Sequence, residues 1–311
     1  MNETLREHGR FAPTTSGPAH PGTLLAGLLA WLDVRSLRGR FSLRLENVDP
    51  DRCLPEHADD MRAALAWLGL DWDDCSLQSE HQAAFEAALD RLAGQELLYP
   101  CACSRADVQR AGLHAVDGSW RYPGTCRERA LPPGGWRESR DALRLRLAPG
   151  RVEPRDEGGL DLAQDPSLEL GDPVLRRRDG AIAYHLAVVV DDAAQGVTRV
   201  VRGRDLAAST ALHVTLQRAL GLPTPRYRHH LLLLEPRGEK LAKLHGAVGW
   251  GELRERYTPD ALCGWLARRA GLREDGEPVT PRELLAGFAW NRVPRQDAVV
   301  RWSGEALEPF P

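Results

Sequence analysis

The sequence predicts an α/β fold, in which strands of a parallel sheet alternate with helices. Two patterns favour this class: apolar and polar residues alternate over 41–46, and apolar residues recur at helical spacing over 54–70. Similar patterns follow one another along the chain, as they do in βα units. The 311 residues fit one large domain or about two to three smaller ones. A hydrophobic content of 42% and nine tryptophans suffice for a large core.

The first elements are a short strand and a long helix. Residues 9–12 are expected to form the strand, which enters a loop of small residues. A leucine-rich helix then begins at about Thr23, and the alternating segment 41–46 forms the next strand. This order places a small-residue loop in front of a helix N-terminus.

Two further helices are expected before residue 100. The helix over 54–70 ends at Gly69, and the helix over 79–94 begins with a capping box formed by Ser79 and Gln82. Four apolar residues share one face of the earlier helix: Ala58, Met61, Leu65 and Leu68. That face is expected to be buried against the sheet.

The second half differs in composition before α/β patterns return. Residues 101–180 are rich in Arg, Pro and Gly, which is typical of loops and indicates an inserted module. Residues after 250 are expected to be helical. Within the inserted module, one strand is expected over 142–148. Between the module and residue 250, strands are expected over 181–190, 197–203 and 228–234, with a helix over 206–221.

These patterns divide the chain into five segments. Those expected are an N-terminal tail (1–8), the first half of the α/β domain (9–99), the inserted module (100–178), the second half (179–250) and a helical C-terminal region (251–311). No internal repeat is visible.

Charge and cysteine content exclude several classes of protein. The net charge is −3, so a nucleic acid must be bound by a local patch, for which the C-terminal part (17 basic and 13 acidic residues over 201–311) is the better candidate. The charged start of the chain is unlike a signal peptide, and the apolar runs are too short to span a membrane. Six cysteines do not indicate a secreted disulfide scaffold. We therefore expect a cytoplasmic monomer.

Two features point to phosphate chemistry. The small-residue loop leads through His20 and Gly22 into a helix whose free N–H groups and dipole favour an anion, although many such turns are only tight connections. There is no G-x-G-x-x-G fingerprint of a dinucleotide site. The only two lysines among 41 basic residues are Lys240 and Lys243, and a lysine follows a moving phosphate as a mobile point charge.

Four motifs resemble the glutamate branch of the class I aminoacyl-tRNA synthetases. "GRFAPTTSGPAHPGT" (9–23) resembles the segment that carries HIGH, and "KLAKL" (240–244) resembles KMSKS. "RLENVDPDR" (44–52) and "VVRGRDL" (200–206) are similar to two further motifs of the glutamyl enzymes. The resemblance implies a Rossmann-type parallel sheet and activation of L-glutamate by ATP, with Mg²⁺.

The short C-terminal part narrows the resemblance. Only the 67 residues 245–311 follow the lysine motif, too few for the anticodon-binding region of glutamyl-tRNA synthetases. This resembles the glutamyl-queuosine tRNA(Asp) synthetases, which transfer glutamate to the queuosine base in the anticodon loop of tRNA(Asp). The alternatives are a truncated glutamyl-tRNA synthetase that charges tRNA(Glu) and a non-catalytic paralogue that binds tRNA.

The resemblance also implies roles for single residues. In the amino-acid site, arginines match the two carboxylates of glutamate and Glu46 matches its ammonium group. Two departures from the family pattern are Ala242, in place of the serine of KMSKS, and Thr23, in place of the second histidine of HIGH. The residues expected to bind glutamate are Arg10, Phe11, Ala12, Pro13, Thr14, Glu46, Tyr184 and Arg202. Those expected to bind ATP are His20, Gly22, Thr23 and Lys243, with His20, Lys240 and Lys243 as catalytic residues.

The inserted module contains a candidate zinc site. Cys101, Cys103 and Cys126 offer three thiolates, and a tetrahedral zinc needs a fourth ligand. The resemblance implies Tyr122 in that position and one zinc per chain, whereas His114 is the alternative from ligand chemistry alone. The remaining cysteines, Cys53, Cys75 and Cys263, are expected to be small buried residues.

Overall fold

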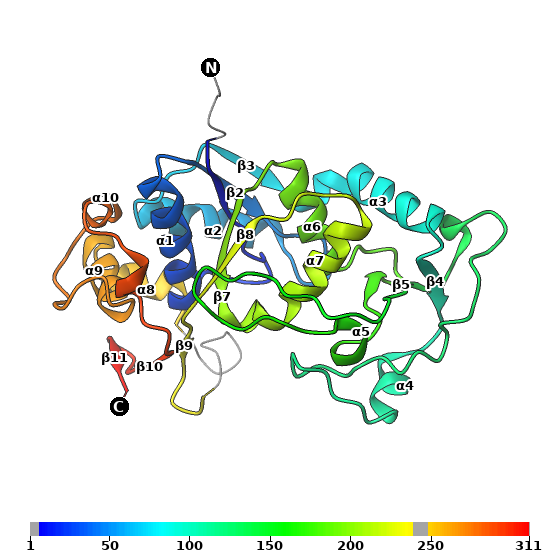
Figure 1. The fold of residues 1–311 in the computed structure, drawn as a ribbon. Coiled ribbons are helices and arrows are strands. Elements are labelled where there is room, and N and C mark those ends of the chain that lie inside the picture. Colours follow the sequence, from blue (N-terminus) through cyan, green and yellow to red (C-terminus); the bar gives the residue numbers. More distant parts are fainter. Residues whose placement is uncertain (1–5, 239–247, 311) are drawn as a thin grey trace, which may run out of the picture. The chain divides into compact units, whose positions relative to one another are not determined.

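The protein forms two compact units in its computed structural model, which describes residues 6–238 and 248–310 (Figure 1). Unit 1 comprises residues up to Leu77 together with 197–204 and 226 onward, and unit 2 comprises 78–196 and 205–225. Both units are discontinuous in sequence. They cut across the five segments expected from the sequence, and those boundaries stay a prediction.

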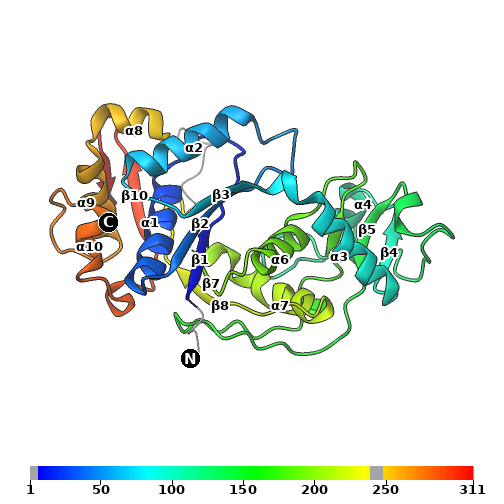
Figure 2. The same ribbon diagram turned by 90° about the horizontal axis from the view of Figure 1, so that it is seen from above.

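Unit 1 is built on a sheet of five parallel strands, which confirms the predicted fold class (Figure 2). The strand order is β3-β2-β1-β7-β8, so the chain leaves β1 toward one edge and later returns to build the other. The order therefore reverses between β1 and β7. The strands are β1 (His8–Phe11), β2 (Arg40–Leu45), β3 (Asp74–Leu77), β7 (Arg199–Gly203) and β8 (Arg226–His230).

The second strand is more deeply buried than its alternating sequence predicts. Every residue of β2 after Arg40 is buried, because the strand pairs with β1 on one side and β3 on the other. Even Arg44 is fully buried, and its Nη2 lies 3.6 Å from Oε1 of Glu46. Burial on both faces is usual in parallel sheets, so the alternation of 41–46 does not distinguish a core face from a solvent face.

Helices α1 (Pro21–Ser36) and α2 (Pro55–Trp67) follow β1 and β2. Helix α1 begins two residues before Thr23, contacts β1 and β7, and is apolar around most of its surface, which suits a helix inside a core. The predicted inner face of α2 is buried, and Gly69 ends the segment with a φ of 89°. Pro21 and Pro55 stand in the first turns, where a missing N–H costs nothing.

The C-terminal part of unit 1 contains strands as well as helices. Residues 298–309, which were expected to be helical, form β10 (Ala298–Trp302) and β11 (Leu307–Pro309). The predicted strand over 228–234 divides: its first part is the end of β8, and β9 (Leu233–Leu234) pairs with β10 in a separate three-stranded sheet. The helices here are α8 (Trp250–Arg256), α9 (Pro259–Arg269) and α10 (Pro281–Leu285), with a 3-10 turn at Trp290–Arg292.

Unit 2 combines a small antiparallel sheet with helices. The sheet has the order β4-β5-β6, formed by Leu98–Cys101, Ala142–Leu145 and Val174–Arg176. Its helices are α3 (Gln82–Gly94), α4 (Arg105–Arg110), α5 (Pro166–Glu169), α6 (Tyr184–Ala194) and α7 (Thr210–Ala219), with 3-10 turns at Gln78–His81, Trp136–Glu138 and Arg204–Ser209, the last starting in unit 1. Across the described residues of both units, every helix is too short or too polar to cross a membrane.

Two sequence predictions in unit 2 are wrong. The apolar run 181–190, predicted as a strand, leads into helix α6, because a continuous apolar run is equally compatible with a buried helix. The capping box of Ser79 and Gln82 does not form, since residues 78–81 make a 3-10 turn and α3 begins only at Gln82. The buried carboxylate of Asp191 holds the turn instead. It accepts a hydrogen bond of 2.7 Å from Gln78 Nε2, and its other oxygen lies 2.7 Å from His81 Nδ1.

A buried ion pair between Asp33 and Arg199 links α1 to β7. Arg199 donates from Nε and Nη2 to the two carboxylate oxygens of Asp33, at 2.6 and 2.9 Å. Trp290 Nε1 donates to the same carboxylate at 2.6 Å. Asp33 and Arg199 are both buried, so each charge depends on the other for compensation. The pair joins the helix after β1 to the strand beside β1.

Asp33→Ala is expected to destabilise the protein strongly. Removing the carboxylate takes away the acceptor of two Arg199 hydrogen bonds inside the core, and breaking a buried ion pair typically costs about 3–5 kcal/mol. Urea-induced unfolding measures the change. The control is Arg301→Ala, which removes an exposed pair with Glu308 and should cost less than about 1 kcal/mol. Equal midpoints for the two variants would contradict the structural role of Asp33.

Candidate active site and metal centre

The loop after β1 is joined to the end of β2. Pro13 O accepts a hydrogen bond of 2.9 Å from Glu46 N, and Thr15 N–H donates to Glu46 O at 3.1 Å. Glu46 directly follows β2 and is mostly buried. The predicted glutamate-binding loop, which includes Ala12 and Thr14, therefore lies beside the predicted ammonium-binding carboxylate at the carboxyl ends of two neighbouring parallel strands.

Two buried arginines stand where the strand order reverses. Arg10 on β1 is 4% exposed, and Arg202 on the neighbouring β7 is 5% exposed. Arg10 Nη1 donates to Val201 O at 3.4 Å, and Arg202 Nε donates to His229 Nε2 at 3.0 Å. Ligands of open parallel sheets bind outside the carboxyl ends of the strands at such a reversal. Buried guanidinium groups there suit a ligand with carboxylates.

His20 is the N-cap of α1. Its Nδ1 accepts a hydrogen bond of 3.4 Å from Thr23 N–H. The imidazole lies over Gly22: a Cβ on that residue would come within 3.0 Å of His20 Cε1 and 3.1 Å of Nδ1. Glycine thus leaves room for the ring at the start of the helix. The two readings of His20, as a cap and as a phosphate ligand, are compatible, because the cap uses only Nδ1.

Of the other predicted residues, two lie outside the described residues and one belongs to unit 2. Lys240 and Lys243, with the intervening Ala242, lie outside the described residues. Tyr184 belongs to unit 2, where it is the first residue of α6. Its ring centroid is 5.4 Å from that of His185 and 5.7 Å from that of His213. Its predicted contact with glutamate stays a prediction.

Three cysteines of unit 2 meet as predicted. Cys101 ends β4, Cys103 precedes α4, and Cys126 lies in the loop that follows. Their sulfur atoms all lie within 4.8 Å of one another, a grouping that could hold a metal ion. The phenol oxygen of Tyr122 is among them, 3.4 Å from Cys101 Sγ and 3.9 Å from Cys103 Sγ.

The spacing of these atoms fits a tetrahedral metal. With Zn–S bonds of about 2.3 Å, tetrahedral geometry places two ligand sulfurs about 3.8 Å apart. Cys103 Sγ and Cys126 Sγ are 3.7 Å apart. Burial opposes ionisation of Cys126, but hydrogen bonds from Ala102 N–H, Tyr122 and Cys103 outweigh it and lower the pKa of this thiol to about 7. Burial raises the pKa of Cys103 to about 11, so Cys126 ionises more readily than Cys103.

The other candidate ligand and the other cysteines lie apart from this cluster. His114 stacks on Trp120, with ring centroids 4.3 Å apart, and is not part of the metal-compatible group found in the described residues. Cys263 is buried as expected. The same expectation is wrong for Cys75, which is exposed on the edge strand β3, and for Cys53, which is half-buried after the Glu46 loop.

Comparison with known proteins identifies the family. The model of the class I tRNA synthetase (E and Q) catalytic domain matches residues 8–301. A glutamyl-Q tRNA(Asp) synthetase of Symbiobacterium thermophilum is 42% identical, covering 93% of this chain and 94% of its own. The chain belongs to the glutamyl-Q tRNA(Asp) synthetase family. A member from Bordetella bronchiseptica is also 42% identical, over 88% of this chain and 93% of its own.

Solved structures agree with this family at the level of the fold. A glutamate tRNA ligase from Elizabethkingia meningosepticum superposes with a TM-score of 0.79 at 24% identity, over 94% of this chain and 67% of its own. The glutamate-tRNA synthetase of Elizabethkingia anophelis gives the same TM-score at 23% identity. As a member of a tRNA synthetase family, the chain is a ligase, and ATP use follows from the class.

Sequence reasoning missed two residues that surround the predicted ones. His229 on β8 pairs with Arg202 because the two strands are in register at these positions. Arg44 lies behind Glu46 inside the sheet. The "HH" that ends a buried strand is a sequence signal for His229. Polar residues at the carboxyl end of a parallel strand lie at the edge of the sheet where ligands bind. Arg44 was missed because the alternating pattern of 41–46 places it on the polar face of the strand, which predicts exposure.

Gly22→Ala is expected to displace His20 and to destabilise α1. The new methyl group meets the imidazole, and loss of an N-cap contact costs about 0.5–2 kcal/mol. Gly251→Ala is the matched control, since Gly251 is also the second residue of its helix and has open space beside it. The control should be neutral or stabilised by up to about 1 kcal/mol. Urea unfolding and ATP–pyrophosphate exchange compare the two, and unchanged exchange in Gly22→Ala would contradict a role of His20 at the phosphates.

Proposed function

We propose that this chain activates L-glutamate with ATP and transfers it to the queuosine base in the anticodon loop of tRNA(Asp), releasing AMP and pyrophosphate. One observation carries the proposal: the buried Arg10 and Arg202 stand with Glu46 at the carboxyl ends of three adjacent parallel strands. The 42% identity to glutamyl-Q tRNA(Asp) synthetases over most of the chain supports this acceptor over the 3′ end of tRNA(Glu).

The charges of these side chains match those of free glutamate. Glutamate carries two carboxylates and one ammonium group, and the strand ends offer two guanidinium groups and one carboxylate. Arginine binds a carboxylate through two parallel hydrogen bonds, so Arg10 and Arg202 each suit one carboxylate. Burial strengthens the selection, because an uncharged amide in place of a carboxylate would leave a desolvated guanidinium unpaired. Phe11, at the end of β1, and the loop residues Ala12, Pro13 and Thr14 are proposed to border this ligand.

ATP is proposed to bind at the start of α1. The helix N-terminus and the imidazole of His20 offer donors to the α-phosphate, where negative charge grows during adenylate formation. Gly22 and Thr23 form the first turn of the helix, where the phosphates are proposed to bind. Lys243, assisted by Lys240, is proposed to bind the pyrophosphate as it leaves, with Mg²⁺ accompanying ATP. Tyr184 is proposed to contact glutamate, on the resemblance alone.

We further propose one zinc ion per chain, held by Cys101, Cys103, Cys126 and Tyr122. The donor set of three thiols and a phenol at tetrahedral spacing supports it. A bound zinc would fix the loops of the inserted module, whose own core consists of few residues. The reaction we propose also implies a cytoplasmic location, where tRNA and ATP meet, and a monomer stays our expectation.

The test of the function is glutamylation assayed side by side on three substrates. These are tRNA(Asp) with queuosine, tRNA(Asp) without queuosine and tRNA(Glu). We expect product on the first alone, and the product should survive on tRNA that has lost its 3′ adenosine. Charging of tRNA(Glu) would instead establish a truncated glutamyl-tRNA synthetase, and no activation of glutamate would establish a non-catalytic tRNA-binding paralogue.

Arg202→Ala is expected to raise the glutamate KM about 10- to 100-fold, because hydrogen bonds to charged groups contribute about 1.5–3 kcal/mol. Glutamate-dependent pyrophosphate exchange measures this effect. Arg301→Ala, which removes an exposed arginine from β10, is the control. Glutamine should be activated poorly by the parent. Equal activation of glutamine and glutamate would refute the assignment of the two arginines.

Cys126→Ser is expected to lose the metal. Protein purified without chelator should contain about one zinc per chain, and the variant close to none, because one of three thiolates is replaced by a weaker ligand. Cys75→Ser, at an exposed cysteine far from the cluster in sequence, should keep its zinc. Elemental analysis gives the zinc content and limited proteolysis the order of residues 101–130. A parent that is metal-free yet resistant to protease in this segment would contradict the proposal.

A further inference from the structure

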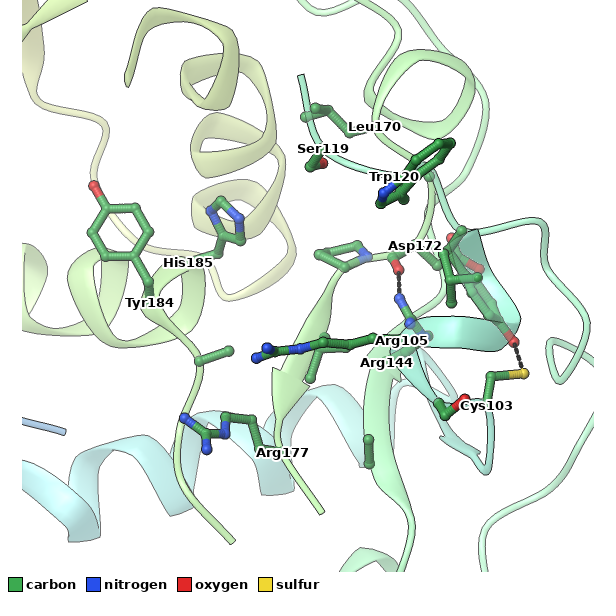
Figure 3. A pocket seen from close by; sticks show the side chains of 18 of the residues that line it. Cys103, Arg105, Ser119, Trp120, Arg144, Leu170, Asp172, Arg177, Tyr184 and His185 are labelled. Atoms are coloured by element: carbon green, nitrogen blue, oxygen red, sulfur yellow. Dashed lines mark hydrogen bonds between the residues drawn. The ribbon is translucent and has the colours of Figure 1, made fainter. Parts of the chain in front are cut away.

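Unit 2 contains a wide cavity of about 1090 Å³ that the reactions above do not use as a whole. Figure 3 shows Tyr184 and His185 on one side of it and Trp120 and Asp172 on the other, with Arg105 and Arg144 between them. The cavity thus extends from the residue predicted to contact glutamate to the loop that carries the metal cluster. Its volume exceeds that of one amino acid and suits a ligand of nucleotide size or larger.

An exposed indole lines the cavity, and two exposed apolar side chains lie on the segments that lead into this lining. Trp120 lines the cavity and is 40% exposed, and its ring packs against that of His114, with centroids 4.3 Å apart. Val116 and Leu168 are 51% and 61% exposed, and hydrogen bonds tie their segments together, from Val116 N to Glu169 O and from Arg121 Nη1 to Leu168 O. Soluble proteins rarely expose such side chains together without a binding role. An indole held by a second ring is a platform on which a base can stack.

The cavity lining also has an excess of positive charge. Among the residues that the structure describes, the side chain of Arg105 makes no hydrogen bond or ion pair, and Arg178 donates only to the neutral Ala102 O. Arg144 likewise donates to a backbone oxygen, that of Asp172, and lies over the ring of Tyr122. The carboxylates of Asp172 and Asp179 are already paired, with Arg127 and Arg177. Asp117 is the remaining carboxylate of this lining.

We infer that this cavity binds a single-stranded segment of the RNA substrate, with a base stacked on Trp120 and phosphates bound by Arg105 and Arg178. The inference rests on the proposed function, because an acceptor base can reach glutamate only if its neighbours in the loop are held nearby. Aromatic platforms beside arginines are how proteins hold unpaired nucleotides. An RNA duplex does not fit this chemistry, since its bases are stacked on one another and cannot reach the indole.

The experiment measures binding of a fluorescent hairpin with the sequence of the tRNA(Asp) anticodon arm. Trp120→Ala should weaken binding about 10-fold, within the range expected for one lost base stack, and Trp120→Phe should restore most of it. Arg105→Ala should weaken binding and reduce the slope of log affinity against log salt by about 0.7, the value for one phosphate contact with a single strand. The tRNA KM of glutamylation should rise in parallel, with the glutamate KM unchanged.

Matched controls separate this site from general surface effects. Phe310→Ala removes another exposed aromatic residue, and Arg110→Ala removes another exposed arginine of α4 that does not line the cavity. Both should bind the hairpin like the parent. Parental affinity in Trp120→Ala and Arg105→Ala, or equally strong binding of a blunt RNA duplex, would overturn the inference. A parent that binds the hairpin through Trp120 but glutamylates no tRNA(Asp) would refute the proposed function and leave the RNA site standing.

Discussion

The reversal of strand order between β1 and β7 is the constraint on which unit 1 depends. These strands are neighbours in the sheet although nearly 190 residues separate them, so the chain must hold them together by contacts distant in sequence. The buried pair of Asp33 and Arg199 does this, since it joins the helix that leaves β1 to the first residue of β7. The same reversal places Arg10 beside the strand that carries Arg202. Fold and candidate site therefore depend on one arrangement.

Much of this arrangement was predictable because its signals are local. The loop of small residues before α1, the glycine that ends α2 and the segment of β7 each depend on residues close in sequence. The wrong predictions concern segments whose secondary structure depends on which other parts of the chain bury them. An apolar run such as 181–190 forms a helix or a strand according to what surrounds it, and the surroundings include Gln78 and His81, more than 100 residues away, which bind Asp191. The short strand β10 depends on its pairing with β9 on one side and β11 on the other.

In the candidate sites, too, some features were predictable from local sequence and others are visible only in the folded structure. Cysteine spacing predicted the metal cluster, but only the folded loop shows the phenol oxygen of Tyr122 accepting from Cys126 N–H at 2.7 Å, among the thiols, while His114 stacks on Trp120. Motif order predicted Arg10, Glu46 and Arg202, since Arg10 and Arg202 lie near the carboxyl ends of their strands and Glu46 directly follows its strand. His229 belongs to none of the four motifs, and its contact with Arg202 arises from the register of β7 and β8. Geometry between strands is information that a linear pattern does not carry.

The choice of arginine over lysine has a physical reason wherever the side chain is buried. Arg199 uses two hydrogen bonds to one carboxylate, Arg144 Cζ lies over the Tyr122 ring at 3.7 Å from its centroid, and the half-buried Arg228 lies over Trp290 at 4.6 Å. A lysine offers neither a planar fork nor a stacking face, so it would lose part of each contact. Nothing in the structure explains the absence of lysine at exposed positions such as Arg110. Lys240 and Lys243 contrast with these fixed contacts: the role proposed for Lys243, following a departing pyrophosphate, suits a flexible ammonium better than a rigid guanidinium.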